Sequence, residues 1–169
     1  MSSRSRSDTF SSRNVFKPVP VARTVTCAGD LRDSQFAVLR QDTVTLGWEE
    51  RLRARARRLS DGGFEFATAL PRGTVLKQDD CFLFDVQRLI VRVVERPEAM
   101  LVIRPQSSRE WGVFAYHIGN SHQPMMIVDD AIVCPDALGM DEILKYHAIP
   151  FGREQRPFTP LGQAADHRH

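Results

Sequence analysis

The sequence lacks most of the features that define specialised classes of protein. Its three cysteines, Cys27, Cys81 and Cys134, are widely spaced and form no Cys-x-x-Cys pair, which favours reduced thiols over a disulfide framework. No apolar run approaches the roughly 18 residues that cross a bilayer. The first fifteen residues also have no apolar segment typical of a secretory signal. We therefore expect a soluble, cytoplasmic protein with no membrane partner.

Charge is distributed unevenly along the chain. Residues 1–58 carry 12 basic and 6 acidic side chains, whereas residues 59–169 carry 11 basic and 15 acidic ones. This asymmetry suggests two units with different partners. Residues 1–17 are rich in serine and arginine and have little to bury, so we expect a disordered N-terminal tail.

Residues 18–95 combine short β-branched runs with turn residues, which predicts a small all-β module. Expected strands are 22–28, 42–48, 64–70, 71–76 and a pair within 81–94. In "RLRARAR" arginines alternate with leucine and alanine, which predicts a strand with one guanidinium face that enters a hairpin at Asp61–Gly63. The same letters also suit a helix, but strict alternation favours the strand. The arginines of this face, Arg51, Arg53, Arg55 and Arg57, are either a solvated sheet face or a protein-docking surface.

The charged, proline-containing "ERPE" at 95–98 marks a candidate boundary, beyond which the pattern changes. Residues 96–160 predict strands at 99–105, 125–130, 131–135 and 155–160, with helices at 107–118 and 136–147. Ser107 or Ser108 is expected to cap the first helix, whose apolar face toward the sheet consists of Trp111, Phe114, Ala115 and Ile118. A β-α-β-β-α-β order predicts a ferredoxin-like domain. The whole chain is therefore expected to be α+β, with residues 161–169 as a flexible tail that contains histidines.

The stretch "YHIGNSHQP" at 116–124 places two histidines around a Gly-Asn pair. We expect Gly119 to be a left-handed helix cap, so that His117 lies in the last helical turn and His122 just beyond it. Pro124 would hold the intervening residue extended. A helix cap is the simplest role for His117, and its alternative role is that of a metal ligand or of a support for the metal site. His122 is either a surface histidine without a role or a metal ligand.

A metal site would need more ligands than this stretch supplies. The sequence contains no His-Glu-x-x-His motif, but it ends in "DHRH", with His167 and His169 two positions apart. These are either part of an ordinary polar terminus or additional ligands. A two-fold dimer that pairs two copies of His122, with the tails folding over, would gather several imidazoles. Imidazole ligands suit both nickel and zinc.

From about Val21 to Pro160 the chain resembles the urease accessory protein E family. In the first module the resemblance lies in Trp48 followed by the alternating arginines, in "LPRGTVLKQDDCF" and in "VVERPEAMLVI" at the junction. In the second module "AYHIGNSHQP" resembles the Ala-Tyr-His-Leu-Gly-Asn-Arg-His-x-Pro signature of the family. "PFTP" resembles the Pro-Phe-x-Pro that precedes its tail.

The resemblance implies a nickel metallochaperone that works as a homodimer, in which the C-terminal domains meet. The histidine that matches His122 pairs with its two-fold mate to bind Ni²⁺, and Zn²⁺ or Cu²⁺ would also bind. The N-terminal module would be a peptide-binding-like domain for protein contacts. The nickel would pass to the urease apoprotein together with the accessory GTPase.

Several positions depart from the family pattern. Ser121 replaces the usual arginine, and Gln78 and Asp79 replace a common Asp-Gly pair. "AIVCPDAL" lacks the extra histidines of some members, and the tail has only two histidines. We therefore expect a low metal capacity of about one ion per dimer, with the ion held by neutral imidazoles and released as pH falls.

Two other classes of function are less consistent with the sequence. The arginine strand could contact phosphates, but leucine and alanine between the arginines offer no surface on which bases could stack. We therefore expect no nucleic-acid partner. Cys134 with His122 could be a nucleophile and base, but nothing orients the pair, and the cysteines lie in apolar runs typical of buried core thiols. The sequence therefore predicts no enzymatic activity.

Overall fold

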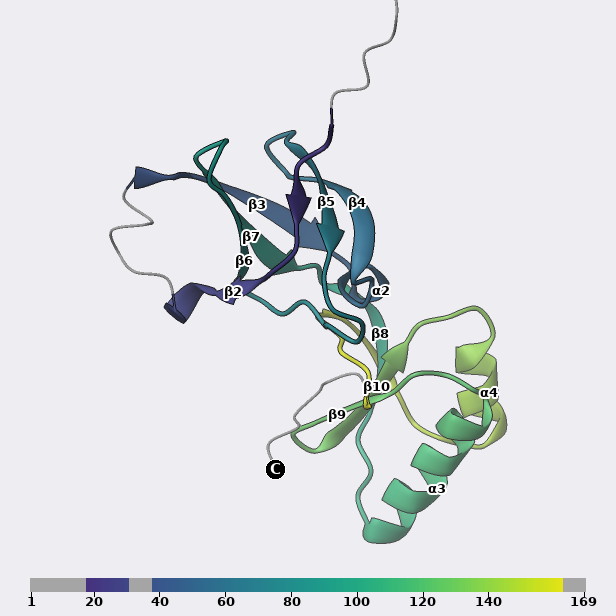
Figure 1. Ribbon diagram of the computed structural model, residues 1–169. Helices are drawn as coiled ribbons and strands as arrows, with labels where there is room; N and C mark the ends of the chain where they lie inside the picture. The colour runs from purple at the N-terminus through teal and green to yellow at the C-terminus, as the bar shows by residue number, and fades with distance from the viewer. Residues whose placement is uncertain (1–17, 31–37, 163–169) are drawn as a thin grey trace, which may run out of the picture.

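The computed structural model describes residues 18–30 and 38–162. These residues fold into an N-terminal part, residues 18–95, and a C-terminal part, residues 96–162 (Figure 1). The predicted N-terminal tail at 1–17 and most of the predicted tail at 161–169 lie outside the described residues. Within the described ranges, no helix is long and apolar enough to cross a membrane.

The N-terminal part is built from two small β-sheets. One sheet has the strand order β1-β5-β4, in which β1 is parallel and β4 antiparallel to β5. The other has the order β2-β6-β7-β3, in which β3 runs parallel to β7. The strands are β1 Val21–Ala22, β2 Thr26–Cys27, β3 Arg40–Leu46, β4 Arg55–Leu59, β5 Glu65–Ala69, β6 Asp80–Phe84 and β7 Leu89–Glu95, with a 3-10 helix η1 Ala28–Asp30 and a short helix α2 Trp48–Arg51.

Phenylalanine rings connect the two sheets through their shared core. The ring of Phe66 in β5 lies 5.5 Å from that of Phe82 and 5.3 Å from that of Phe84, both in β6. Phe64 adds a contact of 5.0 Å to Phe84. Full burial of each such ring contributes about 1.5–3 kcal/mol, so this cluster fixes how the sheets face each other.

The turn between β4 and β5 forms the predicted hairpin at Asp61–Gly63. Gly63 has a φ of 87°, a left-handed conformation that glycine adopts without strain. The carboxylate of Asp61 accepts hydrogen bonds from the hydroxyls of Thr43 at 2.6 Å and Thr45 at 2.9 Å. The bond from Thr43 is the main reason why the pKa of Asp61 lies below its usual range. Asp61 thus ties the hairpin to β3 of the other sheet.

The predicted strand starting at Arg51 is wrong at its beginning. Residues Trp48–Arg51 form helix α2, and the strand begins only at Arg55. The first turn of the helix is stabilised by two carboxylates, since Glu50 accepts from the backbone N–H of Gly47 at 2.9 Å and Glu98 accepts from that of Trp48 at 2.7 Å. The alternating pattern of arginines therefore predicts the strand correctly only from Arg55 onward.

The C-terminal part is a four-stranded antiparallel sheet with two helices. The order of strands across the sheet is β11-β8-β10-β9. Along the chain the elements are β8 Glu98–Ile103, α3 Ser108–Asn120, β9 Met126–Val128, β10 Ala131–Pro135, α4 Met140–Tyr146 and β11 Gly152–Arg156. Helices and sheets thus occur together, so the α+β prediction is confirmed.

Both faces of this sheet are buried. Alternating residues of β8 point to opposite sides, and Leu101 and Ile103 face the helices. Met100 and Val102 face the other way, into a cluster that also contains Phe158. Trp48 of α2 packs on this second cluster. The C-terminal sheet therefore has helices on one face and, on the other, residues from the junction between the N-terminal and C-terminal parts.

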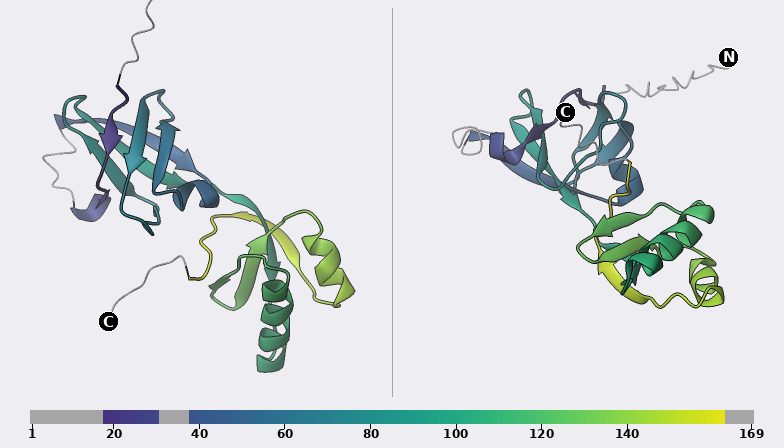
Figure 2. Two further views of the ribbon diagram at one scale, coloured as in Figure 1. Left: turned by 45° about the vertical axis from the view of Figure 1, so that its right-hand side comes forward. Right: turned by 90° about the horizontal axis from the view of Figure 1, so that it is seen from below.

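The junction between the two parts is centred on Arg51. Its side chain is only 2% exposed. Nη1 donates to the carbonyl of Leu76 and to Glu95, both at 2.9 Å, and Nη2 donates to the carbonyl of Phe158 and to Thr159. Burial lowers the pKa of Arg51, and the charge of Glu95 opposes that shift. The C-terminal segment, yellow in Figure 2, returns toward the N-terminal part at this point.

Several expected elements differ from the structure. The expected strand 22–28 is replaced by the short strands β1 and β2. Residues 71–76 form no strand, because Thr74 hydrogen bonds back to Pro71 in a turn. The second helix begins at Met140 rather than at residue 136, because Gly139 has a left-handed φ of 80° that interrupts a helix. The last strand is Gly152–Arg156, and the "PFTP" segment beyond it belongs to the junction.

Candidate functional site

Helix α3 positions the histidine-containing turn. Ser107 is its N-cap, and the Ser107 hydroxyl accepts a hydrogen bond from the backbone N–H of Glu110 at 3.2 Å. Phe114 and Ile118 are buried against the sheet, as the helical spacing predicts. The helix is therefore fixed at its first turn by the cap and along its length by the core.

The end of α3 differs from the prediction. Gly119 is helical, and the helix continues to Asn120 with Ser121 as its cap. A Cβ on residue 119 would make an ordinary contact of 3.4 Å with the Cε of Met125, so packing at this position does not require glycine. The left-handed residue is His122 itself, with a φ of 54°. Histidine, like asparagine, occupies this region more readily than most non-glycine residues.

His122 is held by its backbone while its side chain is exposed. Its N–H donates to the carbonyl of Gly119 at 3.0 Å. The preceding Ser121 hydroxyl donates to the carbonyl of His117 at 2.8 Å, which further fixes the helix end. The result is a single imidazole at the surface, on the short connection between α3 and β9.

Within the described ranges no three histidine, cysteine, aspartate or glutamate side chains lie together so as to hold a metal ion. A metal bound at His122 therefore completes its coordination with ligands from another chain, from residues outside those ranges or from water. The other predicted ligands, His167 and His169, lie outside the described residues, so their role stays a prediction.

The described C-terminal segment passes close to the connection that carries His122. The backbone N–H of Leu161 donates to the carbonyl of Met125 at 2.7 Å, and Met125 is three residues beyond His122. The N–H of Thr159 lies 3.4 Å from the sulfur of Met126. The chain therefore leaves the described structure beside the histidine turn.

His117 is not an isolated helix cap. Its ring stacks on that of His147, with 3.6 Å between centroids and 23° between planes. The sequence prediction placed residue 147 at the end of a helix without assigning it to a site. No local spacing indicates this pair, because the two residues are thirty positions apart and meet only when both helices pack on the sheet.

The arginines predicted to dock protein partners do not share one surface. Arg51 is buried at the junction, so its predicted role on an exposed docking face is wrong. Arg53, Arg55 and Arg57 are exposed. Arg58 is buried, and its Nη2 donates to the carbonyls of Glu50 at 3.1 Å and Arg53 at 2.8 Å. The exposed face of this segment is thus limited to three of the four predicted arginines.

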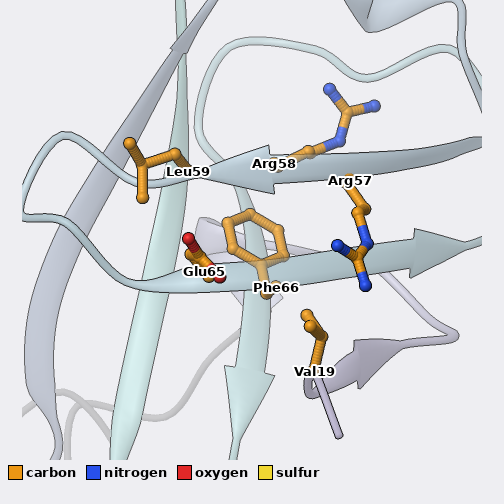
Figure 3. Close-up of a pocket in the computed structure, with 6 residues that line it drawn as sticks. All are labelled: Val19, Arg57, Arg58, Leu59, Glu65 and Phe66. Carbon is orange, nitrogen blue, oxygen red and sulfur yellow. The ribbon is translucent and has the colours of Figure 1, made fainter. Parts of the chain in front are cut away.

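Strand β4 lies at the end of its sheet. The carbonyl of Ala54 accepts a hydrogen bond from the N–H of Leu70, and the N–H of Ser60 donates to the carbonyl of Phe64. Because hydrogen-bonded residues alternate along an antiparallel strand, the backbone groups of residues 55, 57 and 59 point away from β5. A hollow of about 260 Å³ beside the strand is lined by Val19, Arg57, Arg58, Leu59, Glu65 and Phe66. Figure 3 shows the guanidinium groups of Arg57 and Arg58 on opposite sides of β4.

The cysteines do not form a reactive site. Cys81 and Cys134 are buried, and burial raises the pKa of their thiols to about 11 and about 12. These two are the predicted core thiols, whereas Cys27 is exposed and that prediction is wrong for it. A buried, protonated Cys134 is a poor nucleophile.

Comparison with known proteins assigns both parts of the chain. Residues 27–95 match the description "UreE urease accessory protein, N-terminal domain", and residues 98–169 match "UreE urease accessory protein, C-terminal domain". The matches define an accessory protein of urease, which is not an enzyme. The chain belongs to the UreE family.

Several curated relatives carry the name "Urease accessory protein UreE". That of Paraburkholderia xenovorans (strain LB400) is 33% identical over 84% of this chain and 64% of the relative. That of Burkholderia mallei (strain SAVP1) is 30% identical over 84% of this chain and 70% of the relative. That of Bacillus cereus (strain ATCC 10987 / NRS 248) is 28% identical over 76% of this chain and 84% of the relative. The chain thus spans less than two thirds of the Paraburkholderia relative and most of the Bacillus one.

Proposed function

We propose that the chain is a cytoplasmic nickel metallochaperone that delivers Ni²⁺ to apo-urease during urease maturation. The observation that carries the proposal is the exposed His122, held in a left-handed turn at the end of α3. In the proposal two copies of the chain form a homodimer, and the two His122 rings meet on the two-fold axis to bind one ion.

The chemistry of a shared surface site suits transfer. Imidazole is a good ligand for Ni²⁺, and also for Zn²⁺ and Cu²⁺. Two neutral rings leave other coordination positions to water or to further ligands, so a better-buried acceptor can take the ion. Because a bound imidazole must be unprotonated, affinity falls as pH drops and protons compete with the ion for the rings.

The tail histidines are proposed as further ligands of the same ion. Leu161 is hydrogen bonded to Met125, and the six residue steps to His167 can span at most about 20 Å. The three residue steps from Met125 back to His122 span at most about 10 Å. His167 and His169 can therefore reach His122, and their detachment would free the ion.

The same proposal assigns a domain to each half. Residues 18–95 form a β-rich, peptide-binding-like domain, and residues 96–160 form a ferredoxin-like domain for metal binding and dimerisation. The β-α-β-β-α-β order and the sheet order β11-β8-β10-β9 support the second assignment.

Arg53, Arg55 and Arg57 are proposed to dock the partners, which are the urease apoprotein and its accessory proteins, including the accessory GTPase. Their side chains are exposed, and the free edge of β4 can add a strand from a partner. Nucleic acid is a poorer candidate for this edge, because the nearby Phe66 ring is fully buried and the exposed apolar residue is Leu59, which offers no surface for base stacking.

Nickel titration calorimetry with mass measurement in solution tests the proposal. The matched variant is His122→Asn, because asparagine tolerates the left-handed backbone and removes the imidazole. We expect the parent to bind about one tight ion per dimer and His122→Asn to lose it while remaining folded. A chain truncated after Ala165 should bind more weakly. Tight binding that persists in His122→Asn, or a monomeric parent, would contradict the two-fold site.

Transfer needs a separate test with apo-urease and its accessory proteins. Nickel-loaded parent protein should activate the urease, and His122→Asn incubated with the same nickel should not exceed the activation by free ion. Arg55→Glu combined with Arg57→Glu should bind nickel normally and still fail to activate. Full activation by that double variant would exclude the arginines from docking.

A further inference from the structure

Two imidazoles meet within a single chain, apart from the site proposed at His122. His117 lies in the last turn of α3, and His147 caps the C-terminal end of α4. Their rings are in contact at 3.6 Å between centroids. His147 is exposed and His117 is half-buried, so solvent and ions reach the pair.

We propose that His117 and His147 form a second, intrachain binding site for a borderline divalent transition-metal ion such as Ni²⁺, Cu²⁺ or Zn²⁺. These ions prefer neutral imidazole nitrogen, and two rings supplied by one chain act as a chelate. The site holds one ion per chain, with water in the remaining positions. It is separate from the site proposed for the two copies of His122, which holds one ion per dimer.

The electrostatic surroundings favour a cation between the rings. Both histidines sit where a helix ends, and helix C-termini carry partial negative charge from unpaired carbonyls. The nearest basic side chain along α4, Lys145, is paired with Asp141 at 2.8 Å. The pair therefore has no adjacent free ammonium group on that helix to repel an ion.

Each imidazole contacts the tyrosine next to it in the sequence, and the packing of the two helices keeps the imidazoles near one another. Tyr116 packs edge-on against His117 at 5.4 Å, and Tyr146 packs edge-on against His147 at 4.9 Å. The helices that carry the two imidazoles are fixed by Ile118 and Leu144, which are buried in the same core cluster. The rings therefore start close together, which reduces the entropy that metal binding must overcome.

Chelation requires only a small change from the stacked arrangement. Metal–nitrogen bonds are about 2.0–2.1 Å long, so two imidazoles at right angles around one ion have centroids about 4.6 Å apart. The observed 3.6 Å separation must therefore widen by about 1 Å, with rotation of each ring to aim a nitrogen at the ion. Exposed side chains make such rotations readily.

The experiment uses the full-length chain with His122→Asn, His167→Asn and His169→Asn. The chain has five histidines, so this triple variant, which is the reference protein of the experiment, retains only His117 and His147. Zn²⁺ is titrated as a diamagnetic probe while the ring signals are followed by nitrogen-15 NMR, and stoichiometry is measured by calorimetry. We expect both rings to shift together and to saturate at one ion per chain.

The matched control adds His147→Phe, which keeps an aromatic ring on His117 but removes its nitrogens. Loss of the second ligand should weaken binding by about 100-fold, because chelation by linked ligands gains roughly that factor. The proposal would be overturned if, in the triple variant, Zn²⁺ shifted the NMR signals of only one ring or of neither ring. Unchanged affinity in the His147→Phe control would also overturn it. Because His122 is absent from every variant, the outcome is independent of the two-fold site.

Discussion

The junction residue Arg51 offers the sharpest test of how the two parts are held together. Arg51→Met keeps most of the side-chain volume and removes all five N–H donors. It leaves Glu95 without its ion pair, and it leaves the carbonyls of Leu76 and Phe158 without these hydrogen bonds. Glu95 is 18% exposed, so part of the cost of an unpaired carboxylate is relieved by water. Removing one partner of a buried pair typically costs about 3–5 kcal/mol.

The free energy of unfolding of Arg51→Met is measured by urea denaturation, followed by circular dichroism and by tryptophan fluorescence. Trp48 reports on the junction, since its ring packs edge-on against Phe158 at 5.3 Å. We expect a loss of about 3–5 kcal/mol. The control is Arg53→Met, whose side chain is 64% exposed and lies 4.0 Å from Glu49, and which should change stability by less than about 0.5 kcal/mol.

Arg51→Lys is a second variant of the same site. A single ammonium group cannot reach both Glu95 and the carbonyl of Phe158 in the way that a guanidinium fork does, so lysine should restore only part of the lost stability. If Arg51→Met and Arg53→Met both lost only a small and similar free energy of unfolding, the cost of desolvating the Arg51 guanidinium would cancel the gain from its hydrogen bonds. That result would refute our reasoning about the junction.

Three further predictions concern single residues. Asp61→Ala should lower stability by about 1–2 kcal/mol in urea denaturation at neutral pH, through its lost hydrogen bonds to β3. Because the folded pKa of Asp61 is lowered, its contribution to stability is present above the unfolded pKa near 3.9 and is lost as pH falls below that value toward the folded pKa. A difference in unfolding free energy between parent and variant that stayed constant down to pH 2 would contradict this. A thiol reagent at pH 8 should label Cys27 in the folded protein and reach Cys81 and Cys134 only after unfolding, as mass spectrometry of labelled peptides would show. His122→Gly should be more stable than His122→Ala by about 1 kcal/mol in thermal unfolding, since alanine is strained at a φ of 54°; equal stabilities would argue against that backbone geometry.

Local signals in the sequence predicted much of the fold. The Ser107 cap, the buried face of α3 and the Asp61–Gly63 turn each depend on residues a few positions apart, and the structure contains all three. The separation of a β-rich front from a mixed α+β back is also visible in the hydrophobic periodicity.

What the sequence did not predict depends on contacts between distant residues. Arg51 continues a period-two pattern, but its place is decided by Glu98, which helps to start α2, and by Phe158, which lies 107 positions later. The pairing of His117 with His147 is of the same kind, since it arises from packing of two helices. Gly119 fits the usual glycine rule for a helix end, but the helix continues through it to Asn120, and His122 takes the left-handed conformation instead.

The return of Phe158 to the junction has a consequence for folding on the ribosome. The N-terminal part is synthesised first, yet two hydrogen-bond acceptors of Arg51 are on Phe158 and Thr159, which follow it by 107 and 108 residues. Until they emerge, Arg51 has only the partners supplied by Leu76 and Glu95, and the second face of the C-terminal sheet lacks the Phe158 ring. The junction is therefore completed only once Phe158 has emerged, so a polypeptide that stops short of Phe158 should remain open to quality-control proteases at this point.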